Sequence, residues 1–295
     1  MTTGISVFKG VQTALATPML DGEIAWKDME KLILSQLEQG VDGLVAVGTT
    51  GESPTLNDEE HIEVIRRTRE IANGRTPVIA GTGSNSTVEA VRLSQQAEAV
   101  GADALLLVAP YYNKPNQEGL FLHFSEVAKG TRLPILLYSI PSRCGIEIGV
   151  DTVARLHEKF PHVCGIKEAG GSCDRVAELK AALDDNFSIM SGDDALTLPF
   201  LSLGAHGVVS VASNLYVEPL RKMVKAAQNN LPEAQEIFQR FAPLFSALFV
   251  EPNPVPVKVA LAEKGLISSP EVRLPLAPAS EATFNLISRV LTALR

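Results

Sequence analysis

Lys167 is the residue whose type and position point most directly to chemistry. It lies in a short apolar segment, residues 162–168 (HVCGIKE), which predicts a β-strand in which Lys167 is in phase with Val163 and Gly165. An ammonium group facing a dry interior loses its hydration, so its pKa falls and the neutral amine is populated. A neutral amine can attack a ketone and form a Schiff base. Alternatively, the side chain reaches solvent or pairs with Glu168.

A hydroxyl-rich turn, residues 48–53 (GTTGES), follows another apolar segment. The hydroxyls of Thr49 and Thr50 and the free amides of the turn can bind a carboxylate without a formal positive charge. Such local donors would be needed, because a chain with a net charge of −8 does not attract anions over long distances. The alternative is a glycine turn that leads into a helix capped by Asn57.

Two further loops carry side chains with chemical potential. Tyr138 lies near the end of an apolar segment, and Arg143 lies on the loop that follows it. The phenol could relay protons, and the guanidinium could bind a second carboxylate. A packed tyrosine and a solvated arginine are the alternatives. Tyr111 and Tyr112 are adjacent on a loop bounded by prolines, so they must point in different directions and one could reach another subunit.

The elements that must position these residues are eight short apolar segments alternating with segments of helical patterning. The predicted strands are residues 11–17, 41–48, 76–81, 103–109, 133–140, 162–168, 187–191 and 206–211. Strands that are apolar throughout are buried on both faces, and their alternation with helices predicts parallel pairing. The predicted fold is therefore an α/β TIM (β/α)8 barrel. A doubly wound open sheet is the alternative, but residues 16–22 lack the GxGxxG turn common there.

In such a barrel the active site lies where the strands run into their following loops. This rule brings Lys167, Tyr138 and the threonine turn to one end of the barrel. It adds Gly192, which permits close backbone approach, and Val209, which offers a small apolar wall. The alternatives there are an N-cap at Asp193 and core valines.

The helical parts of the chain carry recognisable end signals. Asn57 precedes Glu60 by three residues and Ser86 precedes Glu89 likewise, which predicts capping boxes, and Gly40 and Gly101 suit helix ends. After residue 214 the strand signals stop. We expect a barrel over 1–214 and C-terminal helices over 215–295, partly the last barrel helix, packed on the barrel as one unit. The helices expected there are residues 217–230, 232–248, 256–265 and 279–294.

Composition excludes several classes of protein. Apolar residues make up 45% and charged residues 20%, as in soluble globular proteins. The sequence has no basic cluster that would suggest binding to nucleic acid. It has no apolar run of about 18 residues that would suggest a membrane-spanning helix. The cysteines Cys144, Cys164 and Cys173 form no CxxC pair, and no histidines pair at ligand spacing, so we expect no metal. Residues 1–6 lack a leader pattern, and we expect a reduced, cytoplasmic protein.

Taken together, these motifs resemble the dihydrodipicolinate synthase and N-acetylneuraminate lyase superfamily, over nearly the whole chain. The motifs are GTTGESPTL (48–56), PYYNKP (110–115), YSIPSRCG (138–145), GIKEA (165–169), SGDD (191–194) and PNPVPVK (252–258). The resemblance implies a homotetrameric class I lyase, a dimer of dimers, that needs no cofactor. It implies condensation of pyruvate with L-aspartate 4-semialdehyde to 4-hydroxy-tetrahydrodipicolinate, the first committed step of lysine and diaminopimelate biosynthesis.

The resemblance also implies roles for individual residues. Lys167 would form the imine, and Tyr138, Thr49 and Tyr112 would relay protons, with Tyr112 supplied by a neighbouring subunit. Thr50, with backbone near Gly192 and Val209, would hold pyruvate. Arg143 would bind the semialdehyde carboxylate, which favours the synthase branch over sialic acid lyases. Positions of the family's lysine-inhibition site are matched by Ser53, His61, Asn85, Glu89 and Tyr111.

Some positions depart from the family pattern, and other functions remain open. Ser139 and Cys144 replace the usual Asn and Thr, which bears on the second substrate, while Pro54 and Asp58 depart from the familiar lysine-site pattern. One alternative is a Schiff-base aldolase or dehydratase acting on a 2-oxo-3-deoxy sugar acid or N-acetylneuraminate. An alternative of another class is a non-catalytic protein that binds an oxo acid.

Overall fold

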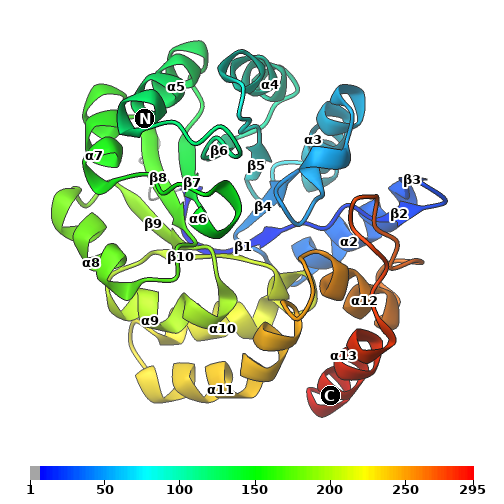
Figure 1. Ribbon diagram of the computed structural model, residues 1–295. Coiled ribbons are helices and arrows are strands. Elements are labelled where there is room, and N and C mark those ends of the chain that lie inside the picture. Colours follow the sequence, from blue (N-terminus) through cyan, green and yellow to red (C-terminus); the bar gives the residue numbers. More distant parts are fainter. Residues whose placement is uncertain (1–6) are drawn as a thin grey trace.

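The computed structural model describes residues 7–295 and contains a closed barrel of eight parallel strands (Figure 1). All eight predicted strands are confirmed, and each pairs with its neighbours in chain order until β10 returns to β1. The strands are β1 (Gly10–Ala14), β4 (Gly43–Ala46), β5 (Val78–Gly81), β6 (Ala104–Val108), β7 (Ile135–Ser139), β8 (Val163–Glu168), β9 (Ser188–Ser191) and β10 (Gly207–Ser210). The predicted barrel fold is therefore correct.

Helices follow the strands and form a ring outside the barrel (Figure 1). They are α2 (Trp26–Glu38), α3 (Asp58–Ala72), α4 (Thr87–Ala99), α5 (Gln117–Gly130), α7 (Val150–Lys159), α8 (Cys173–Ala182), α9 (Thr197–Ser202) and α10 (Val217–Ala226). A four-residue helix, α6 (Pro141–Cys144), lies over the end of the barrel in the view of Figure 1. No helix within residues 7–295 is long and apolar enough to cross a membrane.

The predicted helix ends are largely confirmed. Asn57 and Glu60 form the expected capping box, with each side chain accepting a hydrogen bond from the other residue's amide. Ser86 accepts from the amide of Glu89, but the Glu89 carboxylate accepts from the hydroxyl of Ser84 instead of reaching back, so the second box is only half formed. Gly40 and Gly101 each follow a helix, and each has a positive φ.

The barrel interior is filled by side chains from alternate strand positions, including Ala14, Ile79, Leu106 and Leu136, with Tyr138 at its end. One predicted detail is wrong. The register of β8 shifts between Val163 and Gly165, so Val163 joins the outer core and Cys164 joins the interior cluster. Simple alternation fails because a bulge adds one residue to the strand.

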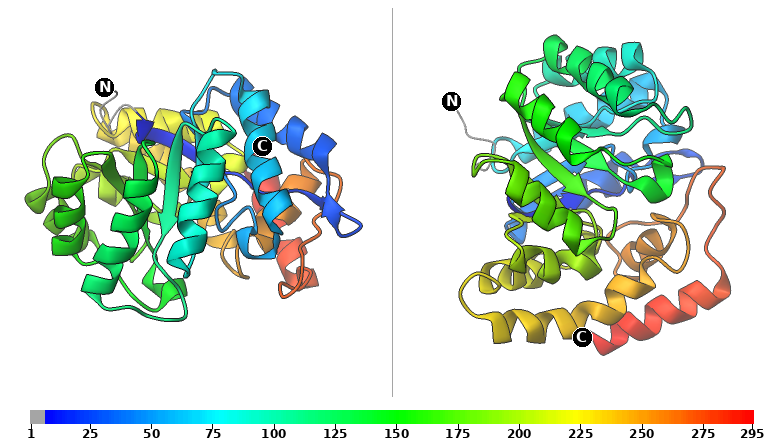
Figure 2. Two further views of the ribbon diagram at one scale, coloured as in Figure 1. Left: turned by 90° about the horizontal axis from the view of Figure 1, so that it is seen from above. Right: turned by 60° about the vertical axis from the view of Figure 1, so that its left-hand side comes forward.

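The C-terminal helices pack against one another and against the barrel. They are α11 (Leu231–Ala247), α12 (Val255–Glu263) and α13 (Glu281–Ala293), close to the predicted ranges. The chain runs from α10 into α11, and α11 lies beside α13 at one side of the barrel (Figure 2). The segment between α11 and α12 reaches the end of the barrel, where its Asn253 contacts Thr50.

A small hairpin precedes α2 and was not predicted. Its strands, β2 (Met19–Leu20) and β3 (Glu23–Ile24), are joined by Asp21 and Gly22, both with positive φ. Asp-Gly is a strong signal for such a turn, but strands of two residues are too short to show alternation.

Candidate active site

Lys167 lies near the end of β8 and points into the barrel rather than into solvent. Lys167 is only 6% exposed, and its Nζ lies 4.1 Å from the centre of the Tyr138 ring. Tyr138 is its direct partner on the adjacent strand β7. The two residues singled out from the sequence are therefore side by side.

Burial controls the charge of this amine. Loss of hydration lowers the pKa of Lys167 to about 7, and the positive charge of Arg143 acts in the same direction, while the carboxylate of Asp194 opposes both. Asp194 is itself buried and accepts hydrogen bonds from the Ser210 hydroxyl and from the amides of Val211 (3.0 Å) and Ala212 (2.9 Å). A substantial fraction of Lys167 is thus neutral at physiological pH.

The alternative that Lys167 pairs with Glu168 is wrong. Glu168 faces the outside of the barrel, where one carboxylate oxygen accepts from Nε of Arg175 (2.8 Å) and the other from the amide of Gly170 (2.7 Å). Successive strand residues point to opposite faces, so the carboxylate and the amine cannot meet. Glu168 therefore does not pair with Lys167, and the carboxylate that favours the ammonium form of Lys167 is that of Asp194.

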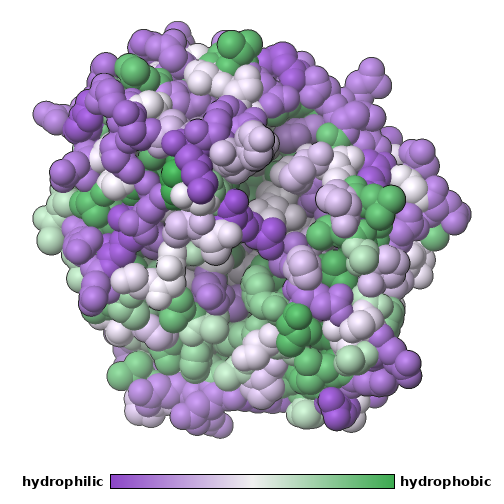
Figure 3. All heavy atoms as spheres, viewed as in Figure 1, coloured by the Kyte–Doolittle hydropathy of each residue, from purple (hydrophilic) through white to green (hydrophobic). Residues whose placement is uncertain are grey.

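Tyr138 and Thr49 meet beside the lysine. Burial raises the pKa of Tyr138 to about 12, although the neighbouring Thr49 hydroxyl and the charge of Arg143 favour the phenolate. Tyr138 keeps its proton at neutral pH and can donate and accept through one oxygen. A cavity of about 30 Å³ lies between Thr49, Tyr138 and Ser53. The face of the molecule seen in Figure 1 is hollowed near its centre (Figure 3).

Thr50 is linked to a residue that the sequence analysis passed over. Nδ2 of Asn253 donates to Oγ1 of Thr50 (2.9 Å), and Nη2 of Arg143 donates to the carbonyl of Asn253 (3.5 Å). Asn253 is 6% exposed, and its Oδ1 has no protein partner among the described residues. Asn253 belongs to the motif at 252–258, but the sequence of this motif does not indicate that the asparagine reaches the barrel end.

Gly192 lies against the lysine, and Val209 lies in the barrel interior. A Cβ at Gly192 would lie 2.6 Å from Cβ of Ala169 and 3.1 Å from Cε of Lys167, so only glycine leaves the amine its space. Val209 is buried in the barrel interior together with Tyr138. The part of both residues in binding pyruvate stays a prediction.

The two unusual residues near Arg143 are accommodated locally. The Ser139 hydroxyl accepts from the amide of Ile148 (3.4 Å), and the Cys144 thiol donates to the carbonyl of Ala109 (3.2 Å). The Ser139 contact joins the end of β7 to the backbone after α6, and the Cys144 contact joins α6 to the backbone after β6. Neither of these contacts displaces Arg143 from its place beside Asn253.

Tyr112 is the predicted site residue that a single chain does not bring to Lys167. It is 90% exposed, its φ is +75°, and within residues 7–295 no hydrogen bond joins it to Lys167, Tyr138 or Thr49. Its neighbour Tyr111 is 36% exposed. The loop is held by the Asn113 side chain, whose Nδ2 donates to the carbonyl of Asn85 (2.9 Å).

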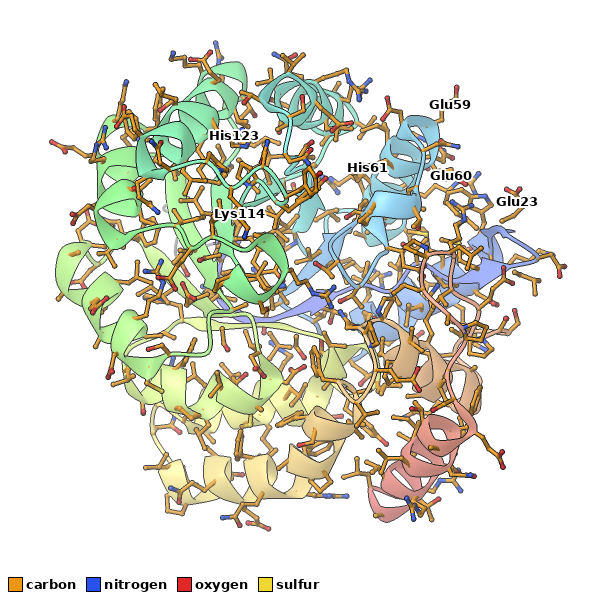
Figure 4. All side chains as sticks on the ribbon, in the orientation of Figure 1. Glu23, Glu59, Glu60, His61, Lys114 and His123 are labelled. Carbon is orange, nitrogen blue, oxygen red and sulfur yellow. The ribbon has the colours of Figure 1, made fainter. Side chains whose placement is uncertain are left out.

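The residues predicted for a lysine site come from several elements: Ser53 follows β4, His61 lies on α3, Asn85 precedes α4, Glu89 lies in its first turn and Tyr111 follows β6. His61 is buried with Nε2 2.8 Å from the carbonyl of Gly81, and desolvation lowers its pKa while Glu89 acts against this. Figure 4 shows His61 on α3 and His123 on α5, on separate helices. In the described part of the chain, no three His, Cys, Asp or Glu side chains gather where a metal ion could be held.

Comparison with known proteins places the chain in a family. The model of the dihydrodipicolinate synthetase family matches residues 7–294. The 4-hydroxy-tetrahydrodipicolinate synthase of Persephonella marina is 48% identical over 92% of this chain and 92% of that protein. A solved synthase of the same name from Methylacidiphilum fumariolicum SolV is 55% identical with a TM-score of 0.95, covering 97% of this chain and 96% of that one.

Other solved relatives bear on ligands and assembly. A chloride-inhibited dihydrodipicolinate synthase from Acinetobacter baumannii, complexed with pyruvate, is 43% identical with a TM-score of 0.95, covering 98% of this chain and 99% of that one. A Cyanidioschyzon merolae enzyme with lysine bound is 40% identical with a TM-score of 0.94, covering 97% and 98%. A monomeric synthase variant is 41% identical with a TM-score of 0.95, covering 99% and 98%.

The chain belongs to the dihydrodipicolinate synthetase family. These relatives confirm the family and the synthase-type lyase predicted from the sequence. They do not favour the sugar-acid aldolase or the non-catalytic alternative.

The charge balance at Lys167 gives a testable pH dependence. In protein labelled with ¹³C at lysine Cε, the Lys167 resonance should titrate with a midpoint near pH 7, far below the ordinary lysine value of 10.5. Arg143→Gln should raise this midpoint, because it removes a positive charge that disfavours the ammonium form. Lys167→Met identifies the resonance. A midpoint above pH 10, or a lower midpoint in Arg143→Gln, would contradict the electrostatic account.

Proposed function

We propose that this protein condenses pyruvate with L-aspartate 4-semialdehyde to 4-hydroxy-tetrahydrodipicolinate, through a Schiff base on Lys167. The observation that carries the proposal is a buried lysine amine whose pKa is about 7, against the ring of Tyr138 and beside Arg143. The names of the relatives support the same reaction. It is the first committed step of lysine and diaminopimelate biosynthesis.

The first half of the reaction activates pyruvate. The neutral amine of Lys167 adds to the C2 carbonyl, and loss of water from the carbinolamine gives a protonated imine. Loss of a proton from C3 then sends its electron pair into the imine, which becomes an enamine. The imine nitrogen takes the electrons that a metal ion would otherwise attract, so the chemistry requires no cofactor.

The second half joins the two substrates and frees the enzyme. The enamine C3 attacks the aldehyde carbon of the semialdehyde, and the aldehyde oxygen takes a proton to become the 4-hydroxyl. The substrate's amino group then attacks the imine carbon, closes the six-membered ring and expels Lys167. One water is released in the whole sequence, from the C2 oxygen of pyruvate.

Proton transfers at the carbinolamine need a group that both donates and accepts. We assign this role to Tyr138, with Thr49 as its partner, because a buried phenol with a pKa of about 12 is protonated yet in contact with the amine. Tyr112 would extend the relay from a second copy of the chain. Its exposure at the tip of a loop supports a role across an interface, within a homotetramer built as a dimer of dimers.

The two substrate carboxylates need separate binding groups. Thr50, with backbone near Gly192 and Val209, would hold the pyruvate carboxylate beside Lys167. Arg143 would bind the semialdehyde carboxylate, since its guanidinium can form two parallel hydrogen bonds with a carboxylate. A sugar-acid substrate gives this arginine no equivalent task.

The barrel (1–214) and the C-terminal helices (215–295) would then act as one unit. Asn253, from the second part, contacts Thr50 and Arg143, which come from the first. Separation of the two parts would therefore disturb both carboxylate sites. The protein would work in the cytoplasm, where its substrates are made, with neither nucleic acid nor membrane as a partner.

A trapping experiment tests the Schiff base. Borohydride reduction in the presence of pyruvate should add one reduced pyruvate to the chain, and peptide mapping should locate it at Lys167. Lys167→Met should form no adduct and lose more than about 1,000-fold in kcat, because the nucleophile is absent. Lys180→Met, a change at a surface lysine, is the control. Activity in Lys167→Met, or an adduct elsewhere, would overturn the mechanism.

A substitution at Arg143 tests the second substrate. Arg143→Ala should raise the KM for L-aspartate 4-semialdehyde by roughly 100-fold, the cost of a lost bidentate ion pair, while trapping of pyruvate at Lys167 persists. Steady-state kinetics with each substrate varied in turn provide the measurement. Efficient turnover of 2-oxo-3-deoxy sugar acids by wild type, with no dependence on Arg143, would favour the aldolase alternative instead.

Feedback inhibition by lysine is part of the proposal. Ser53, His61, Asn85, Glu89 and Tyr111 match the family's lysine site, and Ser53 also lines the cavity beside Thr49 and Tyr138. Lysine bound there would reach the proton relay.

Activity should fall with millimolar lysine, and Glu89→Ala should weaken the inhibition by removing an anionic partner of the ligand's amino group. A rate that stays flat through that range would exclude the site.

A further inference from the structure

A buried ion pair ties the threonine turn to the C-terminal helices. Nζ of Lys258, on α12, donates to Oε1 of Glu52 and to the carbonyl of Glu271 (2.8 Å), and both charged side chains are almost fully buried. The second carboxylate oxygen of Glu52 accepts from the amide of Arg273 (2.9 Å). The carboxylate is thus held from two sides, by groups more than 200 residues away in sequence.

The backbone of the turn is strained on both sides of the threonines. Val47 and Glu52 each have φ +56°, a left-handed conformation that is unfavourable for residues with a side chain and unusual for a β-branched residue. Gly81 must lack a side chain, because a Cβ there would lie 2.2 Å from the carbonyl oxygen of Val47. Strain of this kind persists only where neighbouring contacts hold the conformation.

The anchored residue is bonded directly to the reactive part of the turn. The amide of Glu52 donates to the carbonyl of Thr49 (3.1 Å), and the amide of Gly51 donates to the carbonyl of Gly48 (3.0 Å). Thr50 is held from the same C-terminal segment, since Asn253 lies five residues before Lys258 and donates to its hydroxyl. A displacement of the Glu52 side chain would therefore move both threonine hydroxyls.

Stability alone does not account for a charged pair at this position. Burying two charges costs hydration energy, and apolar replacements of buried ion pairs are often neutral or stabilising. A pair of apolar side chains could join α12 to the barrel equally well. A carboxylate can in addition accept bonds from two directions at once, which defines the orientation of the turn rather than its attachment alone.

We propose that Glu52 and Lys258 are positioning residues for the reaction at Lys167. Their ion pair holds the strained turn so that the Thr49 hydroxyl stays beside Tyr138 and the Thr50 hydroxyl stays where it can bind the pyruvate carboxylate. The proposal rests on the proposed function, because it assigns the pair a purpose in Schiff-base chemistry. The C-terminal segment is then part of the catalytic apparatus, although it touches no reacting atom.

The experiment compares two double variants in the full-length protein. Glu52→Gln/Lys258→Met removes both buried charges together and leaves neither unpaired. The control, Asp42→Asn/Arg221→Met, removes a partly exposed ion pair between α10 and the residue before β4. In that pair Nη2 of Arg221 lies 2.8 Å from Oδ1 of Asp42, which precedes β4 and so lies at the opposite end of this strand from the turn.

Kinetics well below the melting temperature separate positioning from stability. Glu52→Gln/Lys258→Met should lose roughly 10–100-fold in kcat, with a raised KM for pyruvate, because a small displacement of the reacting geometry costs this much. The control should keep wild-type kcat and KM whatever its melting temperature. The Lys167 titration should stay near pH 7 in both. Wild-type kcat and KM in a folded Glu52→Gln/Lys258→Met protein would overturn the proposal.

A conservative change decides the matter should that double variant fail to fold. Glu52→Asp keeps the charge but shortens the side chain, so the ion pair can persist only if the turn shifts. It should fold and show the same kinetic loss, and wild-type kinetics would overturn the proposal. Wild-type protein that forms no pyruvate adduct would instead defeat the proposed function. An adduct in wild type, with unchanged kinetics in the variants, would defeat only the positioning role.

Discussion

The loss of hydration around one lysine amine is the constraint on which the rest of the structure depends. Moving the pKa of Lys167 from 10.5 to about 7 corresponds to a free energy on the order of 5 kcal/mol against the charged form. The barrel avoids most of this cost at neutral pH because the amine can give up its proton. The same burial that disfavours the ammonium makes the residue a nucleophile.

The carboxylates of Glu168 and Asp194 are held by other hydrogen-bond donors. Glu168 is turned outward to Arg175, and the carboxylate of Asp194 is occupied by three donors from the following strand and loop. Tyr138 keeps its proton. The positive charge of Arg143 favours the free amine, and in the proposed reaction its guanidinium would also bind the carboxylate of the second substrate.

Much of this could be predicted from the sequence, because it depends on local patterns. The eight strands are short, apolar and regularly spaced, and strand ends in a parallel barrel meet at one side, which brings Lys167, Tyr138 and Thr49 together. The bulge at Cys164 could not be predicted, since it depends on how β8 registers with β7. Nor could the contacts of Asn253 or Lys258, which join residues about 200 positions apart. The proposed role of Tyr112 depends on a second copy of the chain, which the sequence pattern of one chain does not place.

The central claim is a covalent bond between Nζ of Lys167 and C2 of pyruvate. A crystal structure of the protein soaked with pyruvate tests this most directly. The account predicts continuous electron density from the lysine to the substrate, with the carboxylate at Thr50 and the C2 substituent facing Tyr138. Pyruvate bound without a covalent link, or bound elsewhere while Lys167 remains a free amine, would contradict it.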